Sequence, residues 1–394
     1  VVDTAATATV AGSRHRDCAV CGYSQTETIP ATGGNTGNPS NPGGSGSTNK
    51  PSNPGGSGNT SRPNPGGGSS TTTPTNKPTT TVTTDPKTGA KIETTTRPDG
   101  SKTVVTTQKD GTAVTVETMV NGAVKTEVSL SAEAIQAARQ QGEAVRLPVE
   151  AVHVVRNIPD TMPITVRTGS AEEVQVMIPA VSTTPGTVAM LVGTDASTNV
   201  VKTSVVTAEG VIASLPDGAT VVLVDNSKVF TDVSAGNWAA DAVAFASARG
   251  LFAGTSAMTF SPDAAMTRGM LMTVLARFAG ADTAGGEIWY AKSVEWAVEN
   301  GISDGSNPNG NITREQLVVM LWRYYGSPSA VGTLTGFTDA GQVSDYAQEA
   351  MAWAVENGVV NGFGDGRIGP KGQATRAQVA QILMNLLNNL DLAR

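Results

Sequence analysis

Three Thr-Arg pairs carry the residue types that could bind an anion. Each pair opens an apolar series at helical spacing, and the pairs are Thr267-Arg268, Thr313-Arg314 and Thr375-Arg376. The threonines suit the N-cap of a helix, which puts each arginine at the first helical position, where a cation opposes the helix dipole and costs about 0.3–1 kcal/mol. The free N–H groups of the same turn favour an anion, and a guanidinium matches a carboxylate. Three pairs in register therefore predict carboxylate-binding sites rather than solvated surface arginines.

The elements that must position these arginines are three copies of one unit in residues 227–394. In each copy an aromatic residue precedes a helix, and a glycine ends that helix twelve residues later: Trp238 and Gly250, Trp289 and Gly301, Tyr346 and Gly358. A second glycine follows at Gly254, Gly305 and Gly362, and a loop then leads to the Thr-Arg helix. One unit is too small to bury its apolar face, so we expect the three to share a core.

Composition places that core in the C-terminal part of the chain and argues against two classes of partner. All five Trp, all seven Phe and four of the five Tyr lie after residue 226. The net charge is −7, whereas a nucleic-acid partner needs a basic face. No apolar run approaches the ~20 residues that cross a bilayer. The first ten residues lack a basic head and an apolar core, so they indicate a mature or truncated start rather than a signal peptide.

Residues 1–32 and 33–81 form a small N-terminal piece and a linker. Cys18 and Cys21, the only two cysteines, could form half a zinc site, but His15 is the only further ligand evident and zinc needs four. The alternative is two thiols on a short β piece, and we expect no bound metal. Residues 33–81 are almost entirely Gly, Pro, Ser, Asn and Thr, a composition typical of a disordered tether.

Residues 82–128 and 129–226 are predicted to be β-rich. Glycines recur every eleven residues in the first stretch, in Asp-Gly and Asn-Gly turn sequences, which predicts β-hairpin repeats that form a thin stalk. The second stretch opens with a helix that Ser131 can cap and Gly142 can end, and short Val-rich strands follow. We expect a small β-rich domain there, with His153 as a structural residue.

The three C-terminal copies resemble the S-layer homology (SLH) domain. The resemblance covers about 228–390 and rests on FTDV…WAADAVAFASARGLFAGT…FSPDAAMTRGM, WAVENGISDG…ITREQ and FTDA…WAVENGVVNGFGDGRIGPKGQATRAQ. It divides the region into copies at 227–280, 281–326 and 335–394. The Cys-containing piece is similar to a repeat of surface proteins from anaerobic Firmicutes, although Val10 and Gly34 replace a Cys and a His of that repeat.

The resemblance implies a fold and a function. The implied fold is multidomain: a C-terminal all-α, pseudo-threefold SLH trimer, preceded by the small β-rich domain, the β-meander stalk and the disordered linker. The implied function is non-catalytic and needs no cofactor. An exported protein of the cell envelope, cell wall or S-layer would be anchored to a secondary wall polysaccharide, whose pyruvate ketal supplies a carboxylate. The family's Thr-Arg-Ala-Glu signature assigns the contact with that carboxylate to Arg268, Arg314 and Arg376.

Candidate ligand-binding residues come from this signature and from the loops around it. They are Arg268, Arg314, Arg376, Thr267, Thr313, Thr375, Gly254, Gly305, Gly362, Asp232, Asp339 and Trp238. The copies read Thr-Arg-Gly-Met, Thr-Arg-Glu-Gln and Thr-Arg-Ala-Gln, so not every groove need bind. We favour Arg268 and Arg376 over Arg314, because the second copy has the shorter loop.

Three alternative functions remain open. The chain could be a self-associating S-layer lattice subunit, or a surface adhesin that binds through 129–226. It could also be a fragment of an SLH-anchored wall enzyme whose catalytic domain is absent here. No paired carboxylates, nucleophile with a base, or metal-ligand pattern is evident outside 227–394, so we expect no enzyme activity from these residues.

Overall fold

The computed structural model describes three N-terminal strands and most of the chain from residue 77 onward. The described residues are 2–4, 12–17, 24–29, 77–148, 162–180 and 182–390. The chain divides into two compact units, Val1–Lys77 and Pro78–Arg394. In the first, β1 (Val2–Thr4), β2 (Gly12–Asp17) and β3 (Ser24–Ile29) form an antiparallel sheet. Cys18, Cys21, His153 and most of the predicted linker lie outside the described residues.

The second unit begins with the predicted hairpins. Antiparallel strands β4 to β8 follow one another with tight turns, and they are β4 (Thr79–Thr84), β5 (Lys91–Thr96), β6 (Lys102–Thr107), β7 (Ala113–Thr118) and β8 (Val124–Ser129). The glycine that closes each turn has a positive φ, between 73° and 89°, which a side chain would disfavour. Each eleven-residue period corresponds to one strand and one turn of these successive hairpins.

The same sheet continues into the Val-rich region. Its nine strands run in the order β13-β12-β16-β10-β8-β7-β6-β5-β4. Strand β10 (Ile164–Arg167) joins the hairpins by pairing parallel with β8 and antiparallel with β16 (Ala219–Asp225). The two remaining strands of this sheet are β12 (Thr187–Val192) and β13 (Thr198–Val200).

A second sheet of four strands lies in the same region, in the order β14-β15-β11-β9. Its strands are β9 (Val145–Arg146), β11 (Val174–Pro179), β14 (Val205–Thr207) and β15 (Gly210–Leu215). Helix α1 (Ala132–Gln141) precedes it, and Ser131 and Gly142 cap that helix as predicted. Buried Val, Leu and Ile side chains from both sheets and α1 form one core.

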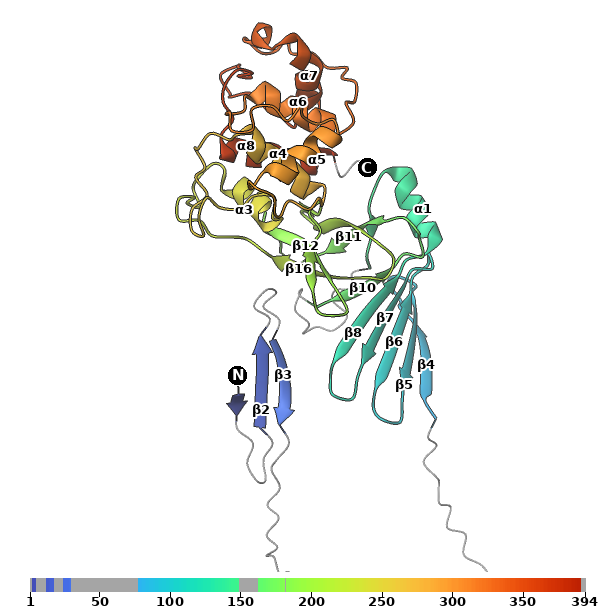
Figure 1. Ribbon diagram of the computed structural model, residues 1–394. Coiled ribbons are helices and arrows are strands. Elements are labelled where there is room, and N and C mark those ends of the chain that lie inside the picture. The colour runs from blue at the N-terminus through green and yellow to red at the C-terminus, as the bar shows by residue number, and fades with distance from the viewer. Residues whose placement is uncertain are drawn as a thin grey trace, which may run out of the picture. The chain divides into compact units, whose positions relative to one another are not determined.

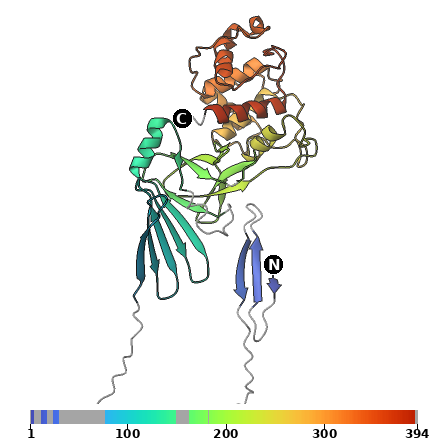
Figure 2. The same cartoon turned by 180° about the vertical axis from the view of Figure 1, so that it is seen from behind.

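The C-terminal helices form the other core of this unit. They are α3 (Ala240–Ala248), α4 (Arg268–Phe278), α5 (Ala291–Glu299), α6 (Arg314–Tyr324), α7 (Gln348–Glu356) and α8 (Arg376–Leu390). Two 3-10 turns, η1 (Ala340–Gln342) and η2 (Asp345–Ala347), precede α7. Figure 1 shows these helices on the side of β12 and β16 that is opposite the hairpins. Figure 2, the view from behind, shows α8 in red beside α3, which belongs to the first copy. The last helix of the third copy thus packs on the first helix of the first.

The predicted fold class is wrong. A large nine-stranded sheet unites strands that we had assigned to a separate stalk and a separate small β domain. The C-terminal region is not a separate all-α trimer either, because Val205 of β14 is part of its helical core. The backbone groups of the expected stalk strand β8 need a partner strand, and the Val-rich β10 provides one. The period of the hairpins indicated local pairing, but not this long-range pairing.

Short β-bridges join the three copies just before their second helices. Ala265 pairs with Thr375, Thr267 with Asn311, and Thr313 with Gln373, so each copy is bridged to both others. These bridges hold the chain just before α4, α6 and α8 begin, and they therefore position the three Thr-Arg pairs.

Candidate functional site

The three Thr-Arg pairs begin helices as predicted. Helices α4, α6 and α8 start at Arg268, Arg314 and Arg376. The preceding threonine hydroxyl accepts a hydrogen bond from the N–H three residues ahead, at 3.2 Å for Thr267, 3.4 Å for Thr313 and 3.3 Å for Thr375. In the second and third copies, the side-chain oxygens of Gln316 and Gln378 accept hydrogen bonds from the backbone N–H groups of Thr313 and Thr375. The threonines therefore position the helix ends.

Each arginine side chain crosses from its own copy to the glycine loop of another copy. Arg376 of the third copy donates to the carbonyls of Phe260 (2.8 Å) and Ala253 (2.8 Å) in the first. Arg314 of the second copy donates to Ile368 (3.0 Å) and Asn361 (3.3 Å) in the third. These bonds offset the dipole cost of an arginine at the first helical position and tie the repeats together.

Arg314 and Arg376 are buried cations without a carboxylate hydrogen-bonded to them. Their exposed fractions are 5% and 6%. Burial lowers the pKa of both guanidinium groups. The negative charges of Asp339, near Arg314, and of Asp232, near Arg376, raise these pKa values by a smaller amount. Within the described residues, their Nη1 groups make no hydrogen bond. Phe rings lie against both guanidinium groups, Phe363 against Arg314 and Phe260 against Arg376. Within the described residues no ion pair neutralises either charge, so each guanidinium could accept an anion.

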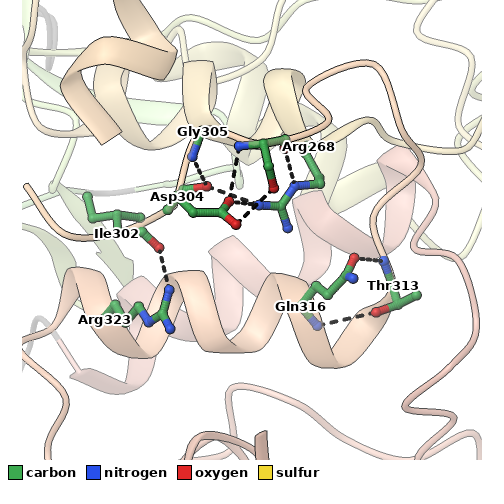
Figure 3. A network of polar contacts seen from close by, with 9 residues as sticks. Arg268, Ile302, Asp304, Gly305, Thr313, Gln316 and Arg323 are labelled. Atoms are coloured by element: carbon green, nitrogen blue, oxygen red, sulfur yellow. Dashed lines mark hydrogen bonds and ion pairs between the residues drawn. The ribbon is translucent and has the colours of Figure 1, made fainter. Parts of the chain in front are cut away.

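Arg268 of the first copy is different, because it is already paired. It crosses to the loop of the second copy, where Nε donates to the Ser306 carbonyl at 2.9 Å and Nη2 donates to Ser303 Oγ at 3.1 Å. Nη2 also forms an ion pair with Asp304 Oδ1 at 2.7 Å, as Figure 3 shows. Asp304 occupies the loop position that Ala253 and Asn361 hold in the other copies, so the carboxylate is particular to the second copy.

A pocket lies at each of the three loops, and every pocket takes residues from all three copies. The first pocket, at the Gly254 loop, is lined by Leu251, Phe252, Ala253, Gly254, Thr255, Met266, Met270, Thr273, Val274, Arg277, Trp289 and Arg376. The second, at the Asp304 loop, is lined by Arg268, Ile302, Ser303, Asp304, Ser306, Gln316, Val319, Met320, Arg323 and Tyr346. The third, at the Gly362 loop, is lined by Trp238, Arg314, Val359, Asn361, Gly362, Phe363, Gln378, Gln381, Ile382 and Asn385.

The three pockets share one plan. Each combines a guanidinium from one copy, the loop and second helix of another, and the leading aromatic residue of the third. That aromatic is well exposed, at 55% for Trp289, 55% for Tyr346 and 61% for Trp238. The cavities have similar volumes, about 440, 410 and 390 Å³ in order. An apolar ring face beside a cation suits a ligand that has both a ring and an acidic group.

The remaining predicted site residues have structural roles in the described chain. Asp232 accepts hydrogen bonds from the N–H groups of Phe260 and Ser261, and Asp339 accepts them from Ile368 and Gly369, so both carboxylates hold loops. Neither lines one of the three pockets.

At two of the loop glycines, backbone atoms of the same loop lie too close to leave space for a side chain. A Cβ on Gly254 would lie 2.3 Å from the Ser256 carbonyl oxygen, and one on Gly362 would lie 2.7 Å from that of Arg367. Gly305 borders the second loop with a positive φ of 71°. Loop packing therefore requires glycine at these positions whether or not a ligand approaches.

The candidate list omitted several residues that line the pockets. Trp289 and Tyr346 occupy positions equivalent to Trp238, and the alignment of the three copies would have found them. Polar residues also recur nine residues after each Thr-Arg arginine, and they are Arg277, Arg323 and Asn385. That spacing was also available in the sequence.

The described residues lack two further kinds of feature. No cluster of three or more His, Cys, Asp or Glu residues suitable for a metal occurs there. In the same part of the chain, no helix is both long and apolar enough to cross a membrane.

Comparison with known families accounts for the threefold pattern. The S-layer homology domain matches three stretches, 229–269, 282–318 and 336–380, each of which spans a first helix, a glycine loop and the start of a Thr-Arg helix. The chain carries three SLH domains. The three pockets therefore lie where the three SLH domains meet, and the crossing arginines belong to the second helix of each domain.

Relatives that share this region have two kinds of name. An amylopullulanase from Thermoanaerobacterium thermosulfurigenes is 33% identical over 41% of this chain, and an endoglucanase from Bacillus sp. (strain KSM-635) is 30% identical over 41%. The S-layer protein sap from Bacillus anthracis is 30% identical over 40% of this chain. The matched regions cover 10%, 19% and 21% of these relatives, so the likeness concerns a small part of each.

These findings establish the general role of the C-terminal region. SLH domains are binding modules that anchor proteins to cell-wall polymers, and they are not catalytic. The SLH domains and the S-layer relatives place the protein at the cell surface.

Proposed function

We propose that the three SLH domains anchor this protein to an anionic wall polysaccharide that carries pyruvate ketals. The observation that supports this most strongly is the shared plan of the pockets. Each places a guanidinium beside an exposed aromatic ring, and each is completed only when three copies assemble. A ketal-bearing sugar supplies the matching groups, a ring face for the aromatic and a carboxylate for the guanidinium.

Arg376 and Arg314 are the proposed carboxylate contacts in the first and third pockets. Both are buried, and neither forms an ion pair within the part of the chain that the structure describes. A carboxylate that binds there would interact with a desolvated cation. Arg268 serves the second pocket, where Asp304 already competes for it. Loop length favours Arg268 over Arg314, whereas the ion pair of Arg268 with Asp304 supports the opposite order, which we propose here. Trp289, Tyr346 and Trp238 would stack on sugar rings.

The rest of the chain would be displayed from this anchor. The nine-stranded sheet holds its hairpins on the side away from the helices, as Figure 1 shows within this unit, and the N-terminal unit precedes them in the chain. A lattice subunit of a surface layer is the second candidate, favoured by the names of the S-layer relatives. An SLH-anchored glycosidase is the third, favoured by the amylopullulanase and endoglucanase.

Binding to purified cell walls tests the anchoring function. The full chain is incubated with walls of the organism that makes it, before and after mild acid treatment of the walls to remove ketals. A Trp238→Ala/Trp289→Ala double variant removes two exposed rings, so we expect little change in folding. Acid treatment and this variant should each weaken binding by about tenfold or more.

The matched control is Val229→Ala/Val331→Ala, which trims two side chains that are 88% and 89% exposed and lie outside the pockets. This control should bind untreated walls as the wild type does. If acid treatment and loss of the two rings both leave binding unchanged, the pockets are not the wall-binding sites.

A further inference from the structure

The three pockets differ at one equivalent position of their second helices. Counting nine residues from the Thr-Arg arginine gives Arg277 in α4, Arg323 in α6 and Asn385 in α8. All three line their pockets, each in its own copy. Sequence equivalence therefore makes them a matched set of side chains in three versions of one site.

In the second and third pockets, the side chain at this position donates a hydrogen bond to a loop carbonyl. Arg323 Nη1 donates to the carbonyl of Ile302 at 3.4 Å, and Asn385 Nδ2 donates to that of Val359 at 3.3 Å. Figure 3 shows Arg323 directed to this carbonyl, across the second pocket from Arg268. Ile302 and Val359 are equivalent residues, the first after the helix-ending glycine.

Arg277 does not make the equivalent bond in the first pocket. Within the described residues, its guanidinium has neither a hydrogen bond to the equivalent Leu251 carbonyl nor an ion pair. Its backbone carbonyl instead accepts a hydrogen bond from Lys202 Nζ, which comes from the β-rich region. A second cation thus sits beside Arg277, and no acidic side chain lines this pocket.

The charges of the pocket linings differ accordingly. The first pocket has two guanidinium groups, Arg277 and Arg376, and no carboxylate. The second also has two, Arg268 and Arg323, but Asp304 offsets one of them. The third has Arg314 alone, among the amides of Asn361, Gln378, Gln381 and Asn385. The first pocket is therefore the most electropositive of the three.

We propose that Arg277 is a ligand-binding residue that makes the first pocket the strongest site for acidic saccharides. This inference rests on the proposed anchoring function and goes beyond it, because it assigns unequal roles to the three pockets. Arg376 and Arg277 contact the acidic saccharide from two elements, the third-copy helix end and the last turn of α4. The third pocket, with two aromatic side chains and several amides, depends less on ligand charge.

If Arg277 has only a structural role, its replacement should change stability and not ligand binding. Arginine in the last turn of a helix interacts favourably with the helix dipole, and that effect concerns stability rather than binding. Arg323 has the same position in α6, so Arg323→Asn removes the same charge from the same kind of site. It serves as the matched control for Arg277→Asn, which installs the residue of the third copy.

Indole resonances of two tryptophans report on the pockets separately. Trp289 lines the first pocket and Trp238 lines the third. The full chain, labelled with ¹⁵N at the indole nitrogens, is titrated with a methyl glycoside that carries one pyruvate ketal, and with the uncharged parent glycoside. In the wild type, Trp289 should shift at lower concentrations of the ketal than Trp238, and salt should weaken binding more at Trp289.

Arg277→Asn should raise the dissociation constant reported by Trp289 about tenfold, as expected for a lost charge-assisted hydrogen bond. It should leave the Trp238 titration unchanged, and Arg323→Asn should leave the Trp289 titration unchanged. If both tryptophans respond in the wild type but Arg277→Asn alters neither, Arg277 is not a ligand contact and the anchoring proposal survives. If neither tryptophan responds to the ketal in the wild type, both proposals are contradicted.

Discussion

At the scale of single residues, the crossing arginines have two roles that are hard to separate in sequence. Their hydrogen bonds to loop carbonyls stabilise the contact between copies, and their side chains also line the pockets. Asp304 changes the charge in its pocket but not the contact between copies. It forms an ion pair with Arg268, which still donates a hydrogen bond to the Ser306 carbonyl. The loop residue before the second glycine is thus one of the residues that determine the charge of a pocket.

The change Asp304→Asn should therefore activate the second pocket. Asparagine is the residue at the equivalent position of the third copy, and it removes the carboxylate that competes for Arg268. Because Asp304 is largely exposed, the competing ion pair is weak, and we expect a gain of a few-fold in ketal binding. Chemical shifts of the Tyr346 ring would measure it. A gain equal to that of Asp282→Asn, which breaks an exposed ion pair elsewhere, would contradict this prediction.

At the scale of elements, Glu315 connects the start of α6 to the 3-10 turn that carries Tyr346. Its carboxylate is nearly buried and accepts hydrogen bonds from the Ser344 N–H and hydroxyl, from Tyr346 and from Lys371. Burial alone would raise the pKa of Glu315, but these partners outweigh it and hold that pKa below 4.5. The charged carboxylate thus helps to fix the aromatic residue of the second pocket.

A lowered carboxylate pKa makes this contribution depend on pH in a defined direction. The stabilisation is complete above the unfolded pKa of about 4.5 and disappears as pH falls through the lower folded pKa. Glu315→Gln should lower Tm at pH 7, and the difference from wild type should shrink below about pH 4.5. Thermal unfolding between pH 3 and 7 would show this, with the exposed Glu349→Gln as control. A difference that is the same at every pH would contradict it.

At the scale of the whole second unit, Arg249 joins the helical and β-rich regions. It follows α3, is fully buried, and donates to the carbonyls of Ser204 (2.9 and 2.7 Å), Thr187 (3.2 Å), Pro185 (3.2 Å) and Phe245 (3.1 Å). Burial lowers the pKa of Arg249 to about 9, so the guanidinium stays charged at neutral pH. Asn226 adds a bond to the Ala248 carbonyl at 2.6 Å.

Replacing Arg249 should uncouple these regions. Arg249→Leu leaves several buried carbonyls without a donor, so we expect a loss of about 3 kcal/mol in the free energy of unfolding. Calorimetry should show a cooperative transition of residues 78–394 in the wild type that separates into two in the variant. The control is Arg139→Leu, in the last turn of α1, where the side chain is half exposed. A variant that keeps one transition at the wild-type Tm would show that Arg249 does not couple the regions.

The sequence by itself determined the local features of this protein. The N-cap threonines, the helix starts at the three arginines, Ser131 and Gly142 around α1, and the hairpins at eleven-residue intervals depend on residues close in the chain. The threefold repeat and the SLH resemblance also follow from sequence, because the copies can be aligned with one another. The SLH resemblance is confirmed by the match of the SLH domain to three stretches of the chain.

Only the tertiary structure decided the contacts between distant segments. Pairing of β8 with β10 and insertion of Val205 into the helical core depend on which exposed edge or apolar face meets which partner, and many partners satisfy the same local pattern. The pockets are of this kind too. Arg376 contacts residues more than a hundred positions earlier, and Trp289 joins it from a different copy. Sequence spacing indicated that the arginines could bind an anion, whereas the fold decided which loop, which ring and which neighbouring charge each one meets.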